Sequence, residues 1–599
     1  MQQTKLLLLV AITAQTLLEA CTYQIKPADF VADDREETER INSEAETLFE
    51  EYWQYILRTE PEYATSVGNH QYNDKLTVCG VQCHVQNKVK LQDFKQKAKN
   101  LLPSATGTAK DSLQILIIQL GYQIDLIDIG NHLLPISFLG GPQTDLMFLL
   151  DEVPTKTVKD CQNLIARYNM FTQQVDAKIE LMNEGIRRGI TQHERSLKNL
   201  ETTFLSFDVP VESSPFYEPF KNIQSVGSAE EVQNLQQKAR EAISSSIIPG
   251  FKKLAEYFKN VYRKALRSKA GVSSMSNGVD FYGKILNSHV TADVQPEDIH
   301  NTGLREVARI STEMQATIIS LGLKLSFQQF NDRLRTNQTF AFKSGEEAIQ
   351  MYKDLMFNKI EPKLPQLFKK IPKEKLQIKP APDFMAGGPK AFYVPGSGGN
   401  STGAFYLDVS SLNAQRTYDV VTLAMHEGIP GHHLQIAYAK EQEGLPSFRR
   451  NVIPGANNAF IEGWALYAEF LGNELELYEN PYMLYGHLSE EIFRACRLVV
   501  DTGIHALGWT RQQAIDYMAQ NTASSIKNIE TEVDRYITWP GQACSYKFGE
   551  IKIKQLRKQA QTSLGSKFDV REFHDVVLSS SGPMSFVEQK VKEYIQSAS

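Results

Sequence analysis

Apolar positions recur every three to four residues along most of the chain, which is the period of an amphipathic α-helix. From Arg35 to Leu57, charged and apolar residues mix at this spacing. The same spacing predicts helices over residues 90–103, 109–129, 157–188, 228–267, 296–322, 344–359, 415–427, 432–443, 457–475, 486–506, 511–520, 526–537 and 583–596. Ser344 and Glu347 form a capping box, which marks a helix start. The chain is therefore expected to be mainly helical, without an internal repeat.

Strand signals are few and lie close together. The runs Ala391–Val394 and Ala404–Val409 are rich in β-forming residues, and the segment between them opens with Pro395-Gly396-Ser397-Gly398-Gly399. We expect a small hairpin or sheet near residues 391–409, just before the helix at 415. The stretch Pro372–Pro389 holds several prolines and two glycines and is interpreted as a loop, which could serve as a hinge.

The first twenty residues have the layout of a secretory signal. Lys5 precedes an apolar run from Leu6 to Leu18, and Glu19-Ala20-Cys21 follows. The run is shorter than the about 20 apolar residues of a membrane span. We expect a signal peptide over residues 1–20 and a secreted, extracellular protein, with a buried N-terminal helix as the alternative. Leu18–Cys21 faintly resembles a lipoprotein box, so a bacterial source would make the protein a periplasmic lipoprotein.

Composition narrows the class of protein. A hydrophobic fraction of 42% and a charged fraction of 22% are typical of a folded globular protein. The net charge is −6 without a strongly basic stretch, which argues against a nucleic-acid partner. No later segment is apolar and long enough to cross a membrane. The sequons at Asn337 and Asn400 predict a glycoprotein only if the source is a eukaryote.

Cysteines are too sparse to form the main scaffold. Cys79 and Cys83 stand four residues apart and could pair after export, as could Cys496 and Cys544. The first pair, with His84 beside it, could instead bind a metal ion, which we consider the weaker interpretation.

The segment from Thr422 to Gln435, TLAMHEGIPGHHLQ, carries the most informative chemistry. An apolar helix ends on His426 and Glu427, and two more histidines follow at once. Four titratable groups in so apolar a stretch are costly to bury without a role. In the H-E-x-x-H motif, two histidines one helical turn apart bind zinc and the glutamate is the general base. The segment therefore predicts a zinc centre in which Glu427 is the base.

The second histidine of that motif is displaced here. Pro430 stands four residues after His426, and proline breaks or kinks a helix. The chain is expected to bulge until His432 or His433 faces His426. We favour His432 as the ligand because it needs the smaller insertion, with His433 in the outer shell or as the alternative ligand.

A catalytic zinc needs a third protein ligand and one open position. Glu462 lies thirty residues after His432, on a second amphipathic helix, and would complete a His₂Glu set. Glu469 lies seven residues further on a similar face and could accept a hydrogen bond from a liganding histidine. Both glutamates could also be ordinary surface residues. Zinc suits this ligand set best, although Mn²⁺ or Co²⁺ could occupy it.

Several motifs occur in the order of a known family. They are HEGIPGHHLQ at 426–435, EGWALYAE at 462–469, PEDIHNTG at 296–303, DTGIH at 501–505 and RYITWPGQACSYK at 535–547. This set resembles the family called domain of unknown function 885, over roughly residues 40–595. That family is grouped with gluzincin-type metallopeptidases, which include angiotensin-converting-enzyme-like and thermostable-carboxypeptidase-like enzymes. The resemblance implies one mostly helical, two-lobed domain over 21–599 around a deep cleft, with its motifs in about 390–550.

The resemblance also suggests roles for C-terminal residues. Enzymes of this class use a Tyr or His from C-terminal helices to stabilise the oxyanion, which makes Tyr546 and His505 the catalytic candidates here. Arg535, Lys547 and Arg416 could bind a substrate carboxylate, although for each of them a structural ion pair is the favoured interpretation.

The expected activity is zinc-dependent hydrolysis of peptide bonds. The strand 404–409, with Tyr406 in it, could hold an extended peptide substrate by backbone pairing. One alternative is a metal-dependent hydrolase of small amides or esters that are not peptides. Another is an inactive binding protein that keeps the fold, although a structural zinc site would need no base at Glu427.

Overall fold

Helices dominate the structure, as the sequence predicts. The computed structural model describes residues 27–382, 389–396, 402–412 and 415–598, with side chains from residue 35 onward. The expected signal peptide therefore lies outside the described residues. In the described part of the chain, no helix has both the length and the apolar character that crossing a membrane requires.

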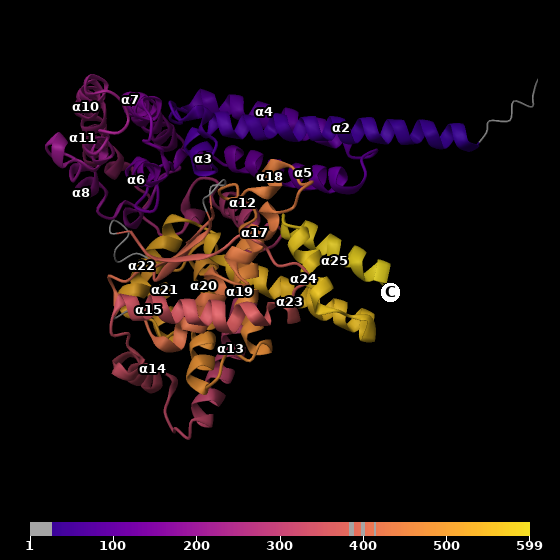
Figure 1. Ribbon diagram of the computed structural model, residues 1–599. Helices are drawn as coiled ribbons and strands as arrows, with labels where there is room; N and C mark the ends of the chain where they lie inside the picture. Colours follow the sequence, from indigo (N-terminus) through magenta and orange to yellow (C-terminus); the bar gives the residue numbers. More distant parts are fainter. Residues whose placement is uncertain (1–26, 383–388, 397–401, 413–414, 599) are drawn as a thin grey trace, which may run out of the picture.

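The N-terminal helices form a layer along the upper side of Figure 1, above the rest of the chain. The long helix α2 packs against α4 and α5, and its outer end projects beyond its neighbours. The helices of this layer are α2 (Pro27–Thr59), α3 (Pro61–Ser66), α4 (Val81–Leu101), α5 (Gly107–Asp128), α6 (Pro142–Glu152), α7 (Val158–Arg188), α8 (Leu200–Leu205), α9 (Glu218–Lys221), α10 (Ala229–Ala242) and α11 (Ile248–Asn260). A wider helical turn at Ile243–Ile247 joins α10 to α11, so the helix predicted over 228–267 is one helical run that ends earlier.

The C-terminal body contains the predicted metal-binding segment. Its helices are α12 (Gly278–Val290), α13 (Pro296–Ser320), α14 (Phe327–Thr336), α15 (Gly345–Lys353), α16 (Val420–Glu427), α17 (His432–Lys440), α18 (Ser447–Arg450), α19 (Asn458–Glu474), α20 (Pro481–His505), α21 (Arg511–Asn521), α22 (Ile526–Thr538), α23 (Ser545–Leu564), α24 (Val570–Ser579) and α25 (Met584–Ala598). The pairs α13–α20 and α19–α23 pack most extensively. The buried helix α20 carries apolar residues on nearly every face, which places it at the centre of this body.

Some helices were not predicted from the sequence. The most important is α23, whose segment EIKIKQL alternates isoleucine with lysine and therefore imitates a strand. Packing against α19 overrides this local pattern. The short α6, α12, α14 and α24 were also not predicted from the spacing of apolar residues.

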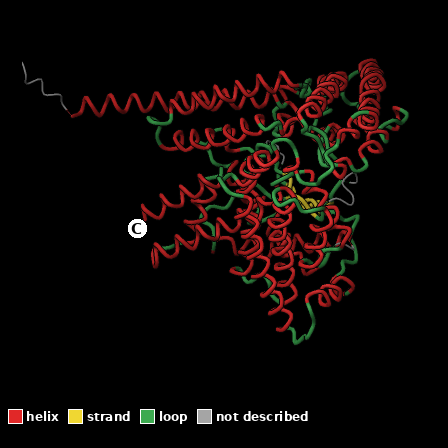
Figure 2. The backbone as a smooth tube through the Cα atoms, turned by 180° about the vertical axis from the view of Figure 1, so that it is seen from behind, coloured by secondary structure: helices red, strands yellow, loops and turns green. Residues whose placement is uncertain are grey.

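A three-stranded sheet lies among the helices, and Figure 2 shows its strands gathered in one place. The predicted hairpin is confirmed, because β2 (Ala391–Val394) pairs antiparallel with β3 (Ala404–Leu407). A third strand, β1 (Gln377–Pro380), pairs parallel with β3 on its other side. The interpretation of 372–389 wholly as a loop was therefore wrong, because the IKP run finds a partner that is distant in sequence.

The cysteines are divided between a disulfide and the core. Cys79 and Cys83 form a disulfide, which confirms the first predicted pair. Cys496 and Cys544 are both free and buried, so the second predicted pair was wrong. The two lobes and the deep cleft implied by the resemblance stay predictions.

Candidate metal centre

A sharp turn separates the two histidine-bearing helices. The helix α16 ends at Glu427, the Ile429–Pro430 peptide is cis, and α17 begins at His432. The predicted interruption of the helix at Pro430 is confirmed. The indole of Trp464 on α19 donates a hydrogen bond to the Pro430 carbonyl at 2.8 Å, which ties the turn to the helix that carries Glu462.

Three side-chain atoms converge beside this turn. The Oε2 atom of Glu462 lies 3.8 Å from Nε2 of His426 and 3.5 Å from Nε2 of His432. The two imidazole rings stand nearly perpendicular, with centroids 4.9 Å apart. Two ligands bound to one tetrahedral zinc ion at about 2.0–2.1 Å lie about 3.3–3.4 Å apart. The two distances to Oε2 of Glu462 are therefore close to the separation that a shared ion would impose.

The local chemistry fits a cation. Among the described residues, Oε2 of Glu462 is buried and makes no hydrogen bond, which is costly for a carboxylate oxygen. Burial raises the pKa of Glu462, but the neighbouring His432 and His426 outweigh it and hold the pKa at about 2. Burial also lowers the pKa of His426 to about 4, so this imidazole is neutral at pH 7 and can donate a lone pair to a metal.

A buried carboxylate orients His426. Oε1 of Glu469 lies 2.7 Å from Nδ1 of His426, which leaves Nε2 directed toward Glu462. This is the carboxylate–histidine arrangement that fixes the tautomer of metal-binding histidines. Arg494 lies 3.7 Å from Glu469 and also pairs with Glu490. Burial raises the pKa of Glu469 to about 7, and the Arg494 charge opposes that rise.

Glu427 lies at the same centre. Ligand atoms of His426, Glu427 and His432 all fall within 4.8 Å of one another. Burial raises the pKa of Glu427, which makes this carboxylate a better proton acceptor. Two carboxylates thus approach the histidines. Of the two, Glu462 has one oxygen close to both Nε2 atoms at once, which makes it the candidate ligand.

His433 has other partners. Its Nδ1 lies 3.1 Å from the Tyr393 hydroxyl of β2, and its Nε2 lies 3.0 Å from the backbone carbonyl of Glu374. With both ring nitrogens engaged, His433 ties the start of α17 to the sheet. The geometry therefore favours His432 over His433 as the ligand.

Tyr546 reaches the centre from α23. Its hydroxyl interacts with the Glu462 carboxylate and lies 3.5 Å from Nε2 of Gln542. Gly463 and Gly549 allow this approach, because a methyl group on either one would overlap the backbone of the other helix. The absence of side chains at both positions brings α19 and α23 together next to Glu462.

His505 lies elsewhere in the core. Its Nδ1 accepts a hydrogen bond from the Val272 amide at 3.2 Å, and its Nε2 lies 2.9 Å from the Tyr536 carbonyl. The ring is fully buried and stacks on Tyr282. Backbone groups thus occupy both ring nitrogens of His505, which leaves neither nitrogen available to a substrate.

The burial of His505 predicts a pH-dependent stability. Burial lowers its folded pKa to about 3, whereas the unfolded chain takes up the proton near pH 6.5. The unfolded state therefore binds more protons between these values, and stability is lost as the pH falls, by about 1.4 kcal/mol per pH unit. Denaturant unfolding at several pH values should show a shallower pH slope for His505→Gln. Equal pH slopes for His505→Gln and the unaltered protein would contradict the assignment.

The predicted carboxylate-binding residues are engaged within the protein. Lys547 is buried and donates to Glu491 and Glu550, each at 2.6 Å. Arg535 pairs with Glu532 and donates to Gln542. Arg416 donates to the backbone carbonyls of Gln415 and Arg335. The contacts of Lys547 and Arg535 match the ion-pair alternative that the sequence left open, whereas the contacts of Arg416 are with backbone carbonyls.

The predicted peptide-binding strand has no free edge. β3 is the central strand of the sheet, with β1 on one side and β2 on the other. Backbone pairing of a peptide along 404–409 was therefore a wrong prediction, because both hydrogen-bonding edges of β3 are occupied. Tyr406 stacks on Phe392 of β2, with ring centroids 5.2 Å apart.

The charged groups behind Glu469 were not predicted from the sequence. Arg494 and Glu490 lie four residues apart on α20, and Lys390 approaches Glu490 and Asp419 at 3.4 Å each. A stripe of charges along the otherwise apolar helix 486–506 was the available signal. The carbonyl of Glu374 and the hydroxyl of Tyr393 carried no comparable signal in the sequence.

Gly431 allows the two histidine-bearing turns to touch. A methyl group there would overlap the carbonyl oxygens of His426 and Met425. We expect Gly431→Ala to destabilise the protein by about 1–3 kcal/mol and to weaken zinc binding, measured by guanidinium unfolding and metal analysis. Gly283→Ala is the matched control, because nothing lies within 4 Å of that position. The added methyl group should push the two turns, and with them His426 and His432, apart. Unchanged zinc content in Gly431→Ala would contradict this expectation.

Comparisons with known proteins place the chain in a family. Residues 61–591 match the family described as "Bacterial protein of unknown function (DUF885)". A solved structure of a "putative lipoprotein" from Colwellia psychrerythraea is 26% identical, with a TM-score of 0.86 over 93% of this chain and 99% of that one.

A second solved structure shares the fold. A "putative lipoprotein of unknown function" from Shewanella oneidensis is 18% identical, with a TM-score of 0.69 over 90% of this chain and 98% of that one. No curated protein matches the chain. None of these descriptions names a peptidase, so the grouping with gluzincin-type enzymes stays a prediction. The chain belongs to the DUF885 family of bacterial proteins of unknown function.

Proposed function

We propose that this protein is a zinc-dependent hydrolase that cleaves peptide bonds. One observation carries the proposal: Nε2 of His426 and Nε2 of His432 lie 3.8 Å and 3.5 Å from the same oxygen, Oε2 of Glu462. His426, His432 and Glu462 would hold the ion, and Glu469 would orient His426. When bound, zinc would supply Lewis-acid chemistry, lowering the pKa of a water molecule to about 7 and polarising a carbonyl.

Glu427 would act as the general base. Its burial raises its pKa, so the carboxylate accepts a proton from water more readily than an exposed glutamate would. The same carboxyl group can then donate that proton to the leaving amine. Glu427 directly follows His426 at the end of α16, so its carboxylate lies beside the proposed ligands. It is not itself one of the three proposed ligands.

Tyr546 would supply the hydrogen-bond donor for the oxyanion. Its hydroxyl stands next to Glu462, and burial raises its pKa, so the hydroxyl keeps its proton at neutral pH. A donor held in a buried site stabilises negative charge better than water does. Arg497 lies over the Tyr546 ring, with its guanidinium carbon 4.6 Å from the centroid, and limits the movement of the ring.

Metal removal tests the proposal. The purified protein should contain about one zinc ion per chain, the single-ion stoichiometry of a His₂Glu site. It should hydrolyse members of a panel of quenched fluorescent peptides. Treatment with o-phenanthroline should abolish cleavage, and added zinc should restore it, because the proposed chemistry requires the ion.

Other outcomes separate the alternatives. Hydrolysis of small amides or esters without cleavage of peptides would change the proposed substrate class but not the proposed metal centre. Protein that contains no transition metal and hydrolyses neither class of substrate would refute the enzymatic proposal.

A further inference from the structure

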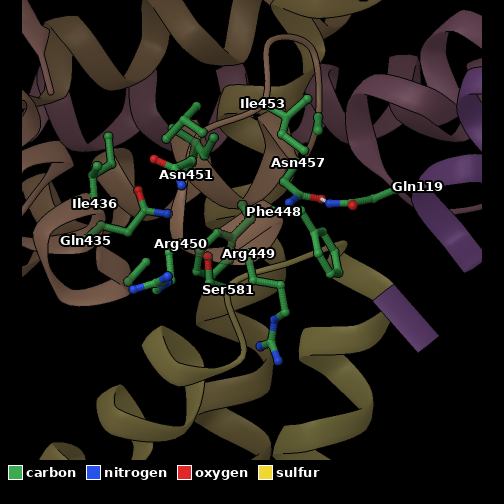
Figure 3. Close-up of a pocket in the computed structure, with 15 residues that line it drawn as sticks. Gln119, Gln435, Ile436, Phe448, Arg449, Arg450, Asn451, Ile453, Asn457 and Ser581 are labelled. Carbon is green, nitrogen blue, oxygen red and sulfur yellow. Dashed lines mark hydrogen bonds between the residues drawn. The ribbon is translucent and has the colours of Figure 1, made fainter. Parts of the chain in front are cut away.

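A polar pocket lies one helical turn from the candidate metal centre. It is enclosed by α5, α17, α18, the loop 451–457 and the start of α19. Figure 3 shows Gln435, Asn451 and Arg450 on one side of this space and Asn457 with Gln119 on the other. Gln435 follows His432 by three residues on α17, and Ile461 of the lining immediately precedes Glu462.

The positive charge in this pocket has no carboxylate at ion-pair distance. Arg449 and Arg450 both line it, and neither forms an ion pair with any carboxylate of the described residues. Arg449 is only 7% exposed, and its Nε atom has no partner, although its terminal nitrogens donate to Ser112 and to the Ser579 carbonyl. Burial lowers the pKa of Arg449 to about 10, and the more distant Asp111 carboxylate offsets only part of this effect.

Arg450 is the more available of the two arginines. Its Nε atom is buried without a partner, and its one bond to another side chain is a long contact of 3.4 Å from Nη2 to the Ser447 hydroxyl. A guanidinium presents five donors in a fork that matches a planar oxyanion. Most of the donors of Arg450 are thus free for a ligand.

The neighbouring groups also favour an anion. Asn457 has a φ of 57° and does not cap α19 with its side chain, because its Oδ1 accepts a hydrogen bond from Gln119. The macrodipole of this helix of 17 residues leaves partial positive charge near Asn457. The Gln435 side chain is 4% exposed, and its Nε2 makes no hydrogen bond within the described residues, so this amide nitrogen is a donor available to a ligand.

We propose that this pocket binds the carboxylate group of a ligand. The space open to water-sized groups is about 30 Å³, and a single water needs about 10–15 Å³ of such space. Two or three water-sized groups fit in it, which matches the size of a carboxylate. Arg450 provides the main charge-assisted hydrogen bonds, and the partial positive charge at the start of α19 and the amide nitrogen of Gln435 complete the site. This site requires no metal ion, so it stands apart from the proposed hydrolase activity.

Calorimetric titration of the full chain at neutral pH tests the proposal. The probes are N-acetylalanine, its neutral amide N-acetylalaninamide, and propionate. Both acids should bind, and the amide should bind at least about tenfold more weakly, since one charge-assisted hydrogen bond is worth about 1.4 kcal/mol or more. Tighter binding of N-acetylalanine than of propionate would indicate the end of a longer molecule, and the reverse would indicate a free short acid.

Variants assign the binding to Arg450. Arg450→Gln should weaken acid binding at least about tenfold, and Arg450→Lys should keep part of it. Arg333→Gln, which removes the same charge from the exposed face of α14, should leave the affinity unchanged. Unfolding curves establish that each variant is folded. Failure of both acids to bind at about 10 mM, equal affinities for acid and amide, or an unaltered affinity in folded Arg450→Gln would overturn the proposal.

Discussion

Replacing Glu427 by glutamine should lower the rate of peptide hydrolysis by about a hundredfold to ten-thousandfold, the usual contribution of a general base. Glutamine has nearly the same shape but cannot accept the proton of water. The zinc content should not change, because the three converging atoms belong to His426, His432 and Glu462. Steady-state kinetics and metal analysis on the same preparation measure both quantities.

Glu443 provides the matched control. It is exposed in the loop after α17, and Glu443→Gln removes the same charge outside the centre. This variant should keep full activity. Full activity of zinc-loaded Glu427→Gln would disprove the proposed base. Loss of zinc from Glu427→Gln would instead make Glu427 a ligand, which its position within 4.8 Å of the histidine nitrogens permits.

Replacing His432 by alanine should empty the zinc site and abolish hydrolysis. Loss of an outer-shell partner typically costs about 10–100-fold in metal affinity, and loss of a ligand should cost more. Glu462 would also lose the neighbour that does most to hold its pKa at about 2, and its burial would then favour the protonated form. Metal content after dialysis, and the unfolding temperature with and without added zinc, measure the effect.

The adjacent His433 offers a sensitive comparison. His433→Ala removes the contacts with Tyr393 and with the Glu374 carbonyl but leaves the three converging atoms in place. We expect this variant to keep its zinc, with a modest loss of stability. An empty site in His433→Ala and a filled one in His432→Ala would reverse the ligand assignment.

The sequence predicted the features that local pattern determines. The helix interruption at Pro430 follows from the missing amide hydrogen of proline, and the placement of Glu462 follows from the number of ligands that zinc needs. The first prediction depended on residues that are close together in the sequence. The second depended on the number of ligands that zinc requires. The orientation of His426 by Glu469 was anticipated for the same reason.

Contacts between distant segments were less accessible from the sequence. The alternation of isoleucine and lysine in α23 is typical of a strand, and its packing against α19 favours the helix instead. The strand β1 was not predicted, because its partner β3 lies some two dozen residues further along the chain. Arg535 and Lys547 carry charges suited to a substrate, but nearby glutamates already neutralise them.

The meeting of Gly463 and Gly549 has a mechanical consequence. With no side chain between their backbones, α19 and α23 lie so close that a methyl group on either glycine would overlap the other helix. Any larger residue at either position would therefore push the two backbones apart and separate Glu462 from Tyr546. At the present helix spacing these two positions tolerate only glycine, whereas substitutions on the outer face of α23 leave the contact intact.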